Sequence, residues 1–109
     1  CWAFTGESGE VTIKLASPTI PTAFALEHVA ASISDRPGAA PRAVEVFGYS
    51  DLASDSEYKL GSFDFDLKKG PLQRFHATPP PEKIAFVKLK VHSNHGFGAF
   101  TCLYRFAVF

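Results

Sequence analysis

Residues 85–92 read Ala-Phe-Val-Lys-Leu-Lys-Val-His, and this stretch decides the fold. Apolar residues occupy every second position from Ala85 to Val91, while two lysines and a histidine stand between them with Phe86. A period of two residues is typical of a β-strand that buries one face and exposes the other. The stretch therefore predicts a strand with one buried face, the clearest in the sequence.

The same extended pattern recurs on both sides of this stretch. Six further segments have it, and turn residues separate them: 11–15, 22–29, 42–47, 58–67, 72–77 and 99–109. Seven short strands without helical periodicity indicate an all-β sandwich. A change of phase at Gly61 predicts a β-bulge within the segment 58–67.

Breaker residues mark the connections between these segments. Residues 34–41 read Ser-Asp-Arg-Pro-Gly-Ala-Ala-Pro, which predicts a surface loop, and the polar run 48–57 predicts a turn region. Pro79 to Pro81 exclude regular structure and predict an exposed polyproline stretch. Residues 93–98 contain glycine and form the expected connection into the last strand.

Composition limits the classes of function. A chain of 109 residues with 46% hydrophobic content suits one domain with one core. Its formal net charge is zero, so it lacks the basic surface that nucleic acids or anionic lipids require, and we expect no nucleic-acid partner. The chain begins with Cys1 rather than Met, which indicates a fragment of a longer protein.

The two cysteines, Cys1 and Cys102, stand near opposite ends of the chain. A disulfide between them would close a loop of about 100 residues and stabilise the fold by roughly 4 to 5 kcal/mol in the chain-entropy model. Such a bond implies an oxidising compartment. The alternative is two buried free thiols, since cysteine is among the most buried residue types.

The sequence gives little support for catalysis or for a metal centre. His92 and His95 are the closest histidine pair, but a zinc site needs three or four convergent ligands. Asp64 and Asp66 share one face of a predicted strand, where carboxylates are usually solvated. No Gly-x-Ser-x-Gly motif is present, so we expect no enzyme and no metal ligands.

His28 and Tyr104 are the better candidates for binding. His28 continues a face whose other members are the apolar Phe24 and Leu26, so its imidazole needs a hydrogen-bond partner at the border of the core. That partner is either a ligand or a neighbouring carbonyl. Tyr104 shares a predicted face with Phe100 and Phe106, so it is either a core residue or a ligand contact.

Four segments carry a resemblance to a known family. They are Cys-Trp-Ala-Phe at 1–4, Leu-Glu-His at 26–28, Ser-Asn at 93–94 and Thr-Cys-Leu-Tyr-Arg-Phe at 101–106. In this order and at these separations they closely resemble the SUN domain of inner-nuclear-membrane proteins that bind KASH peptides. The resemblance covers the whole chain and corresponds to about the C-terminal two-thirds of that domain. It implies an antiparallel sandwich of the jelly-roll, galactose-binding-like kind, truncated at its N-terminal side.

The resemblance also implies roles for particular positions. Cys1 and Cys102 match the intrachain disulfide of the family. His28 and Tyr104 match residues that contact the free carboxylate at the C-terminal end of a KASH peptide. Imidazole and phenol donors suit a carboxylate in a mostly apolar pocket. Ala39 matches a peptide-binding position where relatives often carry a small polar residue.

Parts of the family pattern are absent from residues 1–109. They are the β-hairpin lid, the coiled coil and most of the loop that holds a structural monovalent cation, K⁺, near the backbone of Tyr104. We expect no required cofactor, a homotrimer in the longer protein and a monomer for residues 1–109 alone.

The resemblance thus implies a non-catalytic module of the LINC complex. It would bind KASH tails in the perinuclear space of the nuclear envelope and so tether the nucleus to the cytoskeleton. The alternative is a discoidin-like β-sandwich that binds carbohydrate or lipid head groups. Exposed aromatic residues at loop tips would favour that alternative, but 34–41, 50–57 and 79–83 contain none.

Overall fold

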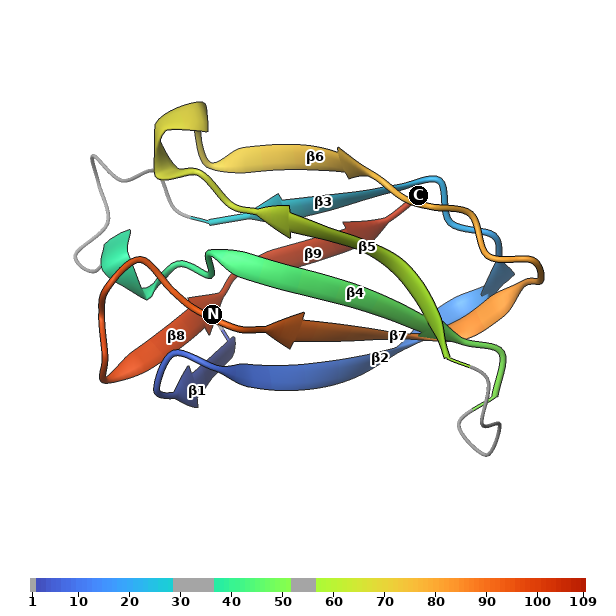
Figure 1. Ribbon diagram of the computed structural model, residues 1–109, viewed down its shortest axis with the longest axis horizontal. Coiled ribbons are helices and arrows are strands. Elements are labelled where there is room, and N and C mark those ends of the chain that lie inside the picture. Colours follow the sequence, from blue (N-terminus) through green and yellow to red (C-terminus); the bar gives the residue numbers. More distant parts are fainter. Residues whose placement is uncertain (1, 29–36, 52–56) are drawn as a thin grey trace.

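The computed structural model describes residues 2–28, 37–51 and 57–109 and is built almost entirely from antiparallel strands (Figure 1). The strands are β1 (Trp2–Thr5), β2 (Gly9–Thr19), β3 (Ala23–Glu27), β4 (Ala43–Tyr49), β5 (Tyr58–Asp64), β6 (Leu72–His76), β7 (Ile84–Val91), β8 (Phe100–Leu103) and β9 (Arg105–Val108). Two single turns of 3₁₀ helix, η1 (Pro37–Ala39) and η2 (Leu67–Lys69), complete the described elements. Neither is long and apolar enough to cross a membrane.

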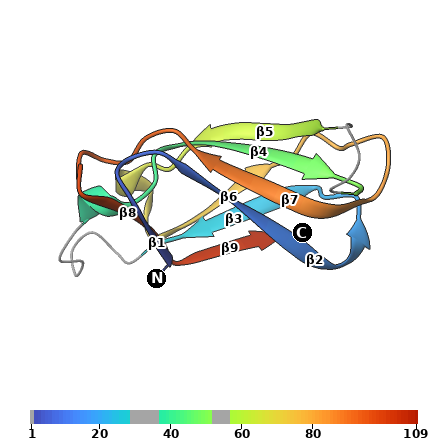
Figure 2. The same cartoon turned by 90° about the horizontal axis from the view of Figure 1, so that it is seen from below.

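The strands form two facing layers. One sheet has the order β2-β7-β4-β5 and the other β6-β3-β9, while β1 pairs with β8. Figure 2 shows the layers from the side, with β4, β5 and β7 in one and β3 and β9 in the other. This arrangement confirms the predicted all-β sandwich.

The core lies between the two sheets. Fully buried side chains come from β3, β4, β5, β7 and the residue that follows β5; among the largest are Phe24, Leu26, Val44, Val46, Leu60, Phe65, Ile84, Val87, Leu89 and Val91. In β7, Val87, Leu89 and Val91 point inward as the alternation predicts. β7 lies between β2 and β4, so the strand that decides the fold is a central one.

The last predicted strand is in fact two strands. Residues 99–109 split at Tyr104 into β8, which pairs with β1, and β9, which pairs with β3. The alternation of side chains gave no sign of this division. Thr101, Cys102 and Leu103 are all buried, and since successive side chains of a strand point to opposite faces, neither face of this part of β8 is open to solvent.

The predicted segment 58–67 ends earlier than its pattern suggests. β5 stops at Asp64, and Asp66 instead caps η2, where its carboxylate accepts a hydrogen bond from the Lys68 backbone N–H at 2.9 Å. The predicted bulge is present, since the register of β4 and β5 shifts opposite Gly61. β4 extends beyond its predicted end to Tyr49. Gly48 permits this, because a Cβ there would lie 2.7 Å from Cδ1 of Ile84.

Two predicted surface connections are partly buried. In the segment 34–41, residues 34–36 lie outside the described part of the chain, and Ala39, Ala40 and Pro41 are buried. η1 packs against the turn that follows β7, where Gly38 O accepts a hydrogen bond from His95 N at 3.0 Å. Among the three prolines, Pro80 is buried between the exposed Pro79 and Pro81. Turn-forming composition predicted the backbone shape here but not the burial.

Candidate functional site

His28 and Tyr104 meet at the end of the sheet that contains β3 and β9. His28 directly follows β3, and Tyr104 directly precedes β9. β3 and β9 are antiparallel and their register pairs Glu27 with Arg105, so His28 and Tyr104 lie beside each other. Their ring centroids are 4.8 Å apart and the ring planes meet at 87°, an edge-to-face contact.

The two rings differ in their access to solvent. His28 is 3% exposed and Tyr104 is 47% exposed. The backbone N–H of His28 donates to Pro71 O at 2.8 Å, which fixes the histidine to the turn before β6. A neutral imidazole carries one donor and one acceptor nitrogen, and a phenol can donate or accept. The pair therefore presents polar groups at the border of an apolar core.

A groove of about 170 Å³ opens beside Tyr104. We call it the Tyr104 groove; it is lined by Trp2, Val11, Ile13, Leu89, Leu103, Tyr104, Arg105 and Phe106. Its walls are mainly apolar, and Arg105 supplies the positive charge. Within the described part of the chain, no carboxylate lies within ion-pair distance of Arg105. An anionic group next to Tyr104 would therefore meet a cation that has no other counter-charge there.

The third predicted binding residue, Ala39, is in a different position. Ala39 is the last residue of η1 and is 1% exposed, and η1 is in contact with β8. The structure therefore brings His28 and Tyr104 together and covers the side chain of Ala39.

Of the two cysteines, Cys1 lies outside the described residues. Cys102 is 4% exposed, lies opposite Ala3 in the β1–β8 pair and is not free. The cysteine pairing is thus still a prediction, although β1 and β8 are neighbours.

Sequence reasoning missed the structural importance of Asn94, which it used only as part of a resemblance. The Asn94 side chain is buried and its Nδ2 donates to Phe97 O at 2.6 Å, Phe100 O at 3.2 Å and Thr101 Oγ1 at 3.1 Å. Its Oδ1 accepts from Gly96 N at 3.0 Å. These bonds hold the turn between β7 and β8. The sequence signal was a turn asparagine two residues before a glycine, and Gly96 has a φ of +104°.

The other histidines have separate partners. His95 Nε2 bonds to Phe65 O at 2.6 Å, and His92 Nε2 bonds to the Glu45 carboxylate. No group of three or more metal-ligating side chains occurs among residues 2–28, 37–51 and 57–109.

Glu45 allows a test of pH dependence. Lys59 Nζ lies 3.1 Å from its carboxylate, and Lys59 and then His92 hold the pKa of Glu45 below 4.5. A lowered pKa in the folded state adds stability above about pH 4.5, which is lost as the pH falls through the lowered pKa. The urea midpoint of the parent chain should fall between about pH 6 and about pH 3, and that of Glu45→Gln should fall slightly less. The difference is small because solvent screens this partly exposed ion pair. Identical falls in both proteins would contradict the assignment.

The comparisons with known proteins agree with this architecture. The family model described as Sad1/UNC-like C-terminal matches residues 1–109. Human sperm-associated antigen 4 protein is 40% identical over 96% of this chain, and mouse SUN domain-containing protein 3 is 37% identical over 99%. The chain spans 24% and 35% of the lengths of these relatives.

A solved structure has the same fold at low identity. The family 32 carbohydrate-binding module of Streptococcus pneumoniae EndoD superposes with a TM-score of 0.74 at 14% identity, over 99% of this chain and 73% of that one. This likeness shows the galactose-binding-like β-sandwich and nothing about ligands. With the whole-length family match, the chain belongs to the Sad1/UNC-like C-terminal family, the SUN domain family.

Proposed function

We propose that this chain is the peptide-binding part of a SUN domain and that its His28–Tyr104 pair receives the C-terminal carboxylate of a KASH peptide. The observation that carries the proposal is the edge-to-face contact of the two rings at 4.8 Å beside an apolar groove. Family membership supplies the partner class, because the relatives include SUN domain-containing proteins.

The chemistry of the groove suits a peptide end. Carboxylates form strong hydrogen bonds with phenol and imidazole donors when apolar walls exclude water. Arg105 lies next to Tyr104 along the chain and lines the same groove, so it adds a favourable positive charge. The residues preceding the carboxylate can pack on Val11, Ile13 and Trp2. Binding and not catalysis is the role that these groups support.

The cellular role follows from the partner. A SUN domain in the LINC complex binds KASH tails in the perinuclear space and tethers the nucleus to the cytoskeleton. A homotrimer of the longer protein, with the Cys1–Cys102 disulfide in each protomer, belongs to this proposal. The oxidising lumen of the nuclear envelope is the compartment in which such a bond persists.

The structural cation enters no step of the proposal. The resemblance places the backbone of Tyr104 near this cation, and no other part of the cation loop is identified in the described residues. One backbone carbonyl cannot hold a cation. The residues present therefore do not form a complete cation site.

The carbohydrate-binding alternative has weaker support. It draws on a fold likeness at 14% identity, which shows architecture alone. The exposed aromatic residues Trp2, Tyr104 and Phe109 lie in or beside strands, and the connection 79–83 has none.

Two substitutions test the proposed pocket. We expect His28→Ala or Tyr104→Phe to weaken binding of a KASH C-terminal peptide by about 1–3 kcal/mol, since each leaves a buried polar group of the complex without its partner. Binding is measured calorimetrically with the chain extended upstream to include the lid hairpin. Matched controls are His76→Ala, at the opposite end of the β3–β6 pair, and Tyr58→Phe, in the other sheet; both variants should bind as the parent does. Unchanged affinity in both pocket variants would argue decisively against the assignment.

A further inference from the structure

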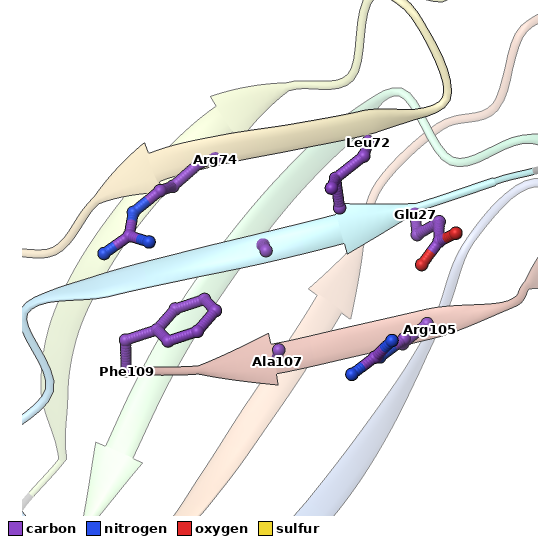
Figure 3. A pocket seen from close by; sticks show the side chains of 7 residues that line it. Glu27, Leu72, Arg74, Arg105, Ala107 and Phe109 are labelled. Atoms are coloured by element: carbon purple, nitrogen blue, oxygen red, sulfur yellow. The ribbon is translucent and has the colours of Figure 1, made fainter.

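The outer face of the β6-β3-β9 sheet carries a second cavity that the proposed function does not use. Outward-facing residues alternate with the core residues Phe24 and Leu26, so Ala25 of β3 and Ala107 of β9 lie on the outer face of the sheet, where Ala25 is only 8% exposed and Ala107 is partly buried. These two small side chains form the floor of a hollow, and Leu72 and Phe109 form its walls (Figure 3). We call this cavity the outer hollow.

The walls of the outer hollow are unusually apolar for a surface. Leu72 is 61% exposed and Phe109 is 50% exposed, and both rank among the exposed large apolar side chains of the described residues. The cavity holds about 190 Å³. Pockets for whole small-molecule ligands usually begin at about 300 Å³, so the outer hollow suits a single apolar side chain.

Positive charge borders this apolar floor. Arg74 and Arg105 line the outer hollow from its two edge strands, and Figure 3 shows both guanidinium groups beside it. The guanidinium carbon of Arg74 lies 4.4 Å from the centre of the Phe109 ring. The ring covers one face of the planar guanidinium group, and the N–H groups at its edge stay available for hydrogen bonds.

Neither arginine forms an ion pair with a carboxylate of the described residues. Glu27 lies opposite Arg105 in the ladder, yet no ion pair of 4.0 Å or less joins either arginine to a carboxylate among residues 2–28, 37–51 and 57–109. Two guanidinium groups and one carboxylate leave the border of the outer hollow positive. A complementary occupant must therefore carry a carboxylate beside an apolar group.

We propose that the outer hollow binds an extended peptide segment that carries an aliphatic side chain and, two residues away, an acidic one. An aliphatic side chain of the segment lies on Ala25 and Ala107 between Leu72 and Phe109. The acidic side chain two residues away lies on the same face of the extended segment and accepts hydrogen bonds from Arg74, and Arg105 adds attraction from the other border. This site needs no free peptide terminus and does not use the rings of His28 and Tyr104; Arg105 is the one residue that lines both the outer hollow and the Tyr104 groove.

The test uses a peptide with both ends blocked, acetyl-Thr-Glu-Thr-Leu-Thr-Glu-Thr-amide, titrated into the ¹⁵N-labelled chain; its leucine and both glutamates share one face when it is extended. We expect changes in the amide chemical shifts of β3, β6 and β9, centred on Ala25 and Ala107. The Arg74→Gln variant should bind the peptide about tenfold more weakly, since loss of a charge-assisted hydrogen bond lowers the affinity by about this factor. Ala107→Leu should weaken binding as well, because it fills the floor. The matched control, Lys14→Gln, removes one charge from the other sheet and should bind as the parent does.

Further peptides and variants separate the alternatives. The same peptide with glutamine for glutamate should bind at least about tenfold more weakly. His28→Ala should leave binding of the blocked peptide unchanged, so failure here and failure of the proposed function are distinguishable. Equal binding of the neutral peptide would overturn the proposal. Self-association through this face, or binding of phosphatidylserine vesicles without binding of the peptide, would also overturn it.

Discussion

Reduction of the chain with a thiol reagent is expected to lower its free energy of unfolding by about 4–5 kcal/mol, if Cys1 and Cys102 form the proposed bond. The physical reason is that a loop of about 100 residues would be freed in the unfolded state. A change of this size is a large part of the total stability of a small domain. The measurement is urea unfolding with and without the reductant.

Trp2 provides a local readout of the same event. It is the only tryptophan in the sequence, lies in β1 and is half-exposed next to Phe4. β1 pairs with β8 through four residues, so loss of the proposed bond should make this short pair open more readily. A variant with both Cys1→Ser and Cys102→Ser should show no response to reductant. Equal urea midpoints for the oxidised and reduced parent chain would rule out the disulfide.

Substitution of Asn94 by alanine is expected to destabilise the chain by about 3 kcal/mol. Within the described residues its side chain makes four hydrogen bonds, three as a donor and one as an acceptor. Thr101 Oγ1, which accepts one of them, itself donates to Gly6 O at 2.8 Å. The asparagine therefore links the turn after β7 to the connection between β1 and β2. Urea unfolding measures the loss.

Asn94→Asp separates the donor and acceptor functions. It keeps an oxygen for Gly96 N but places carboxylate oxygens against Phe97 O and Phe100 O, so it should destabilise about as much as alanine does. A near-native stability for Asn94→Asp would show that the acceptor bond alone matters. Near-native stability for both variants would contradict the role of Asn94 in the turn.

The sequence predicted the sandwich because its central strand is buried on one face. In β7 the alternation of Val87, Leu89 and Val91 follows from contact with a core on one side only. The division at Tyr104 could not be predicted in this way. Apolar residues occupy every second position from Phe100 to Val108, and the change of sheet depends on pairing with β1 and β3, which are distant in sequence.

The candidate sites were predictable to different degrees. His28 and Tyr104 were identified by resemblance, but their contact depends on the register that pairs Glu27 with Arg105. The outer hollow has no local sequence signal. Ala25 and Ala107 are ordinary strand residues until three strands lie side by side and place longer side chains around them.

The most direct test of the central claim, that the His28–Tyr104 pair binds the free carboxylate of a peptide, is a calorimetric titration with two KASH C-terminal peptides. One peptide ends in its natural free carboxylate, and the other carries one additional residue beyond it. With the lid hairpin included in the chain, we predict that the natural peptide binds and that the extended peptide binds at least about tenfold more weakly. Equal affinity for the two peptides would show that the chain end is not recognised and would contradict the account.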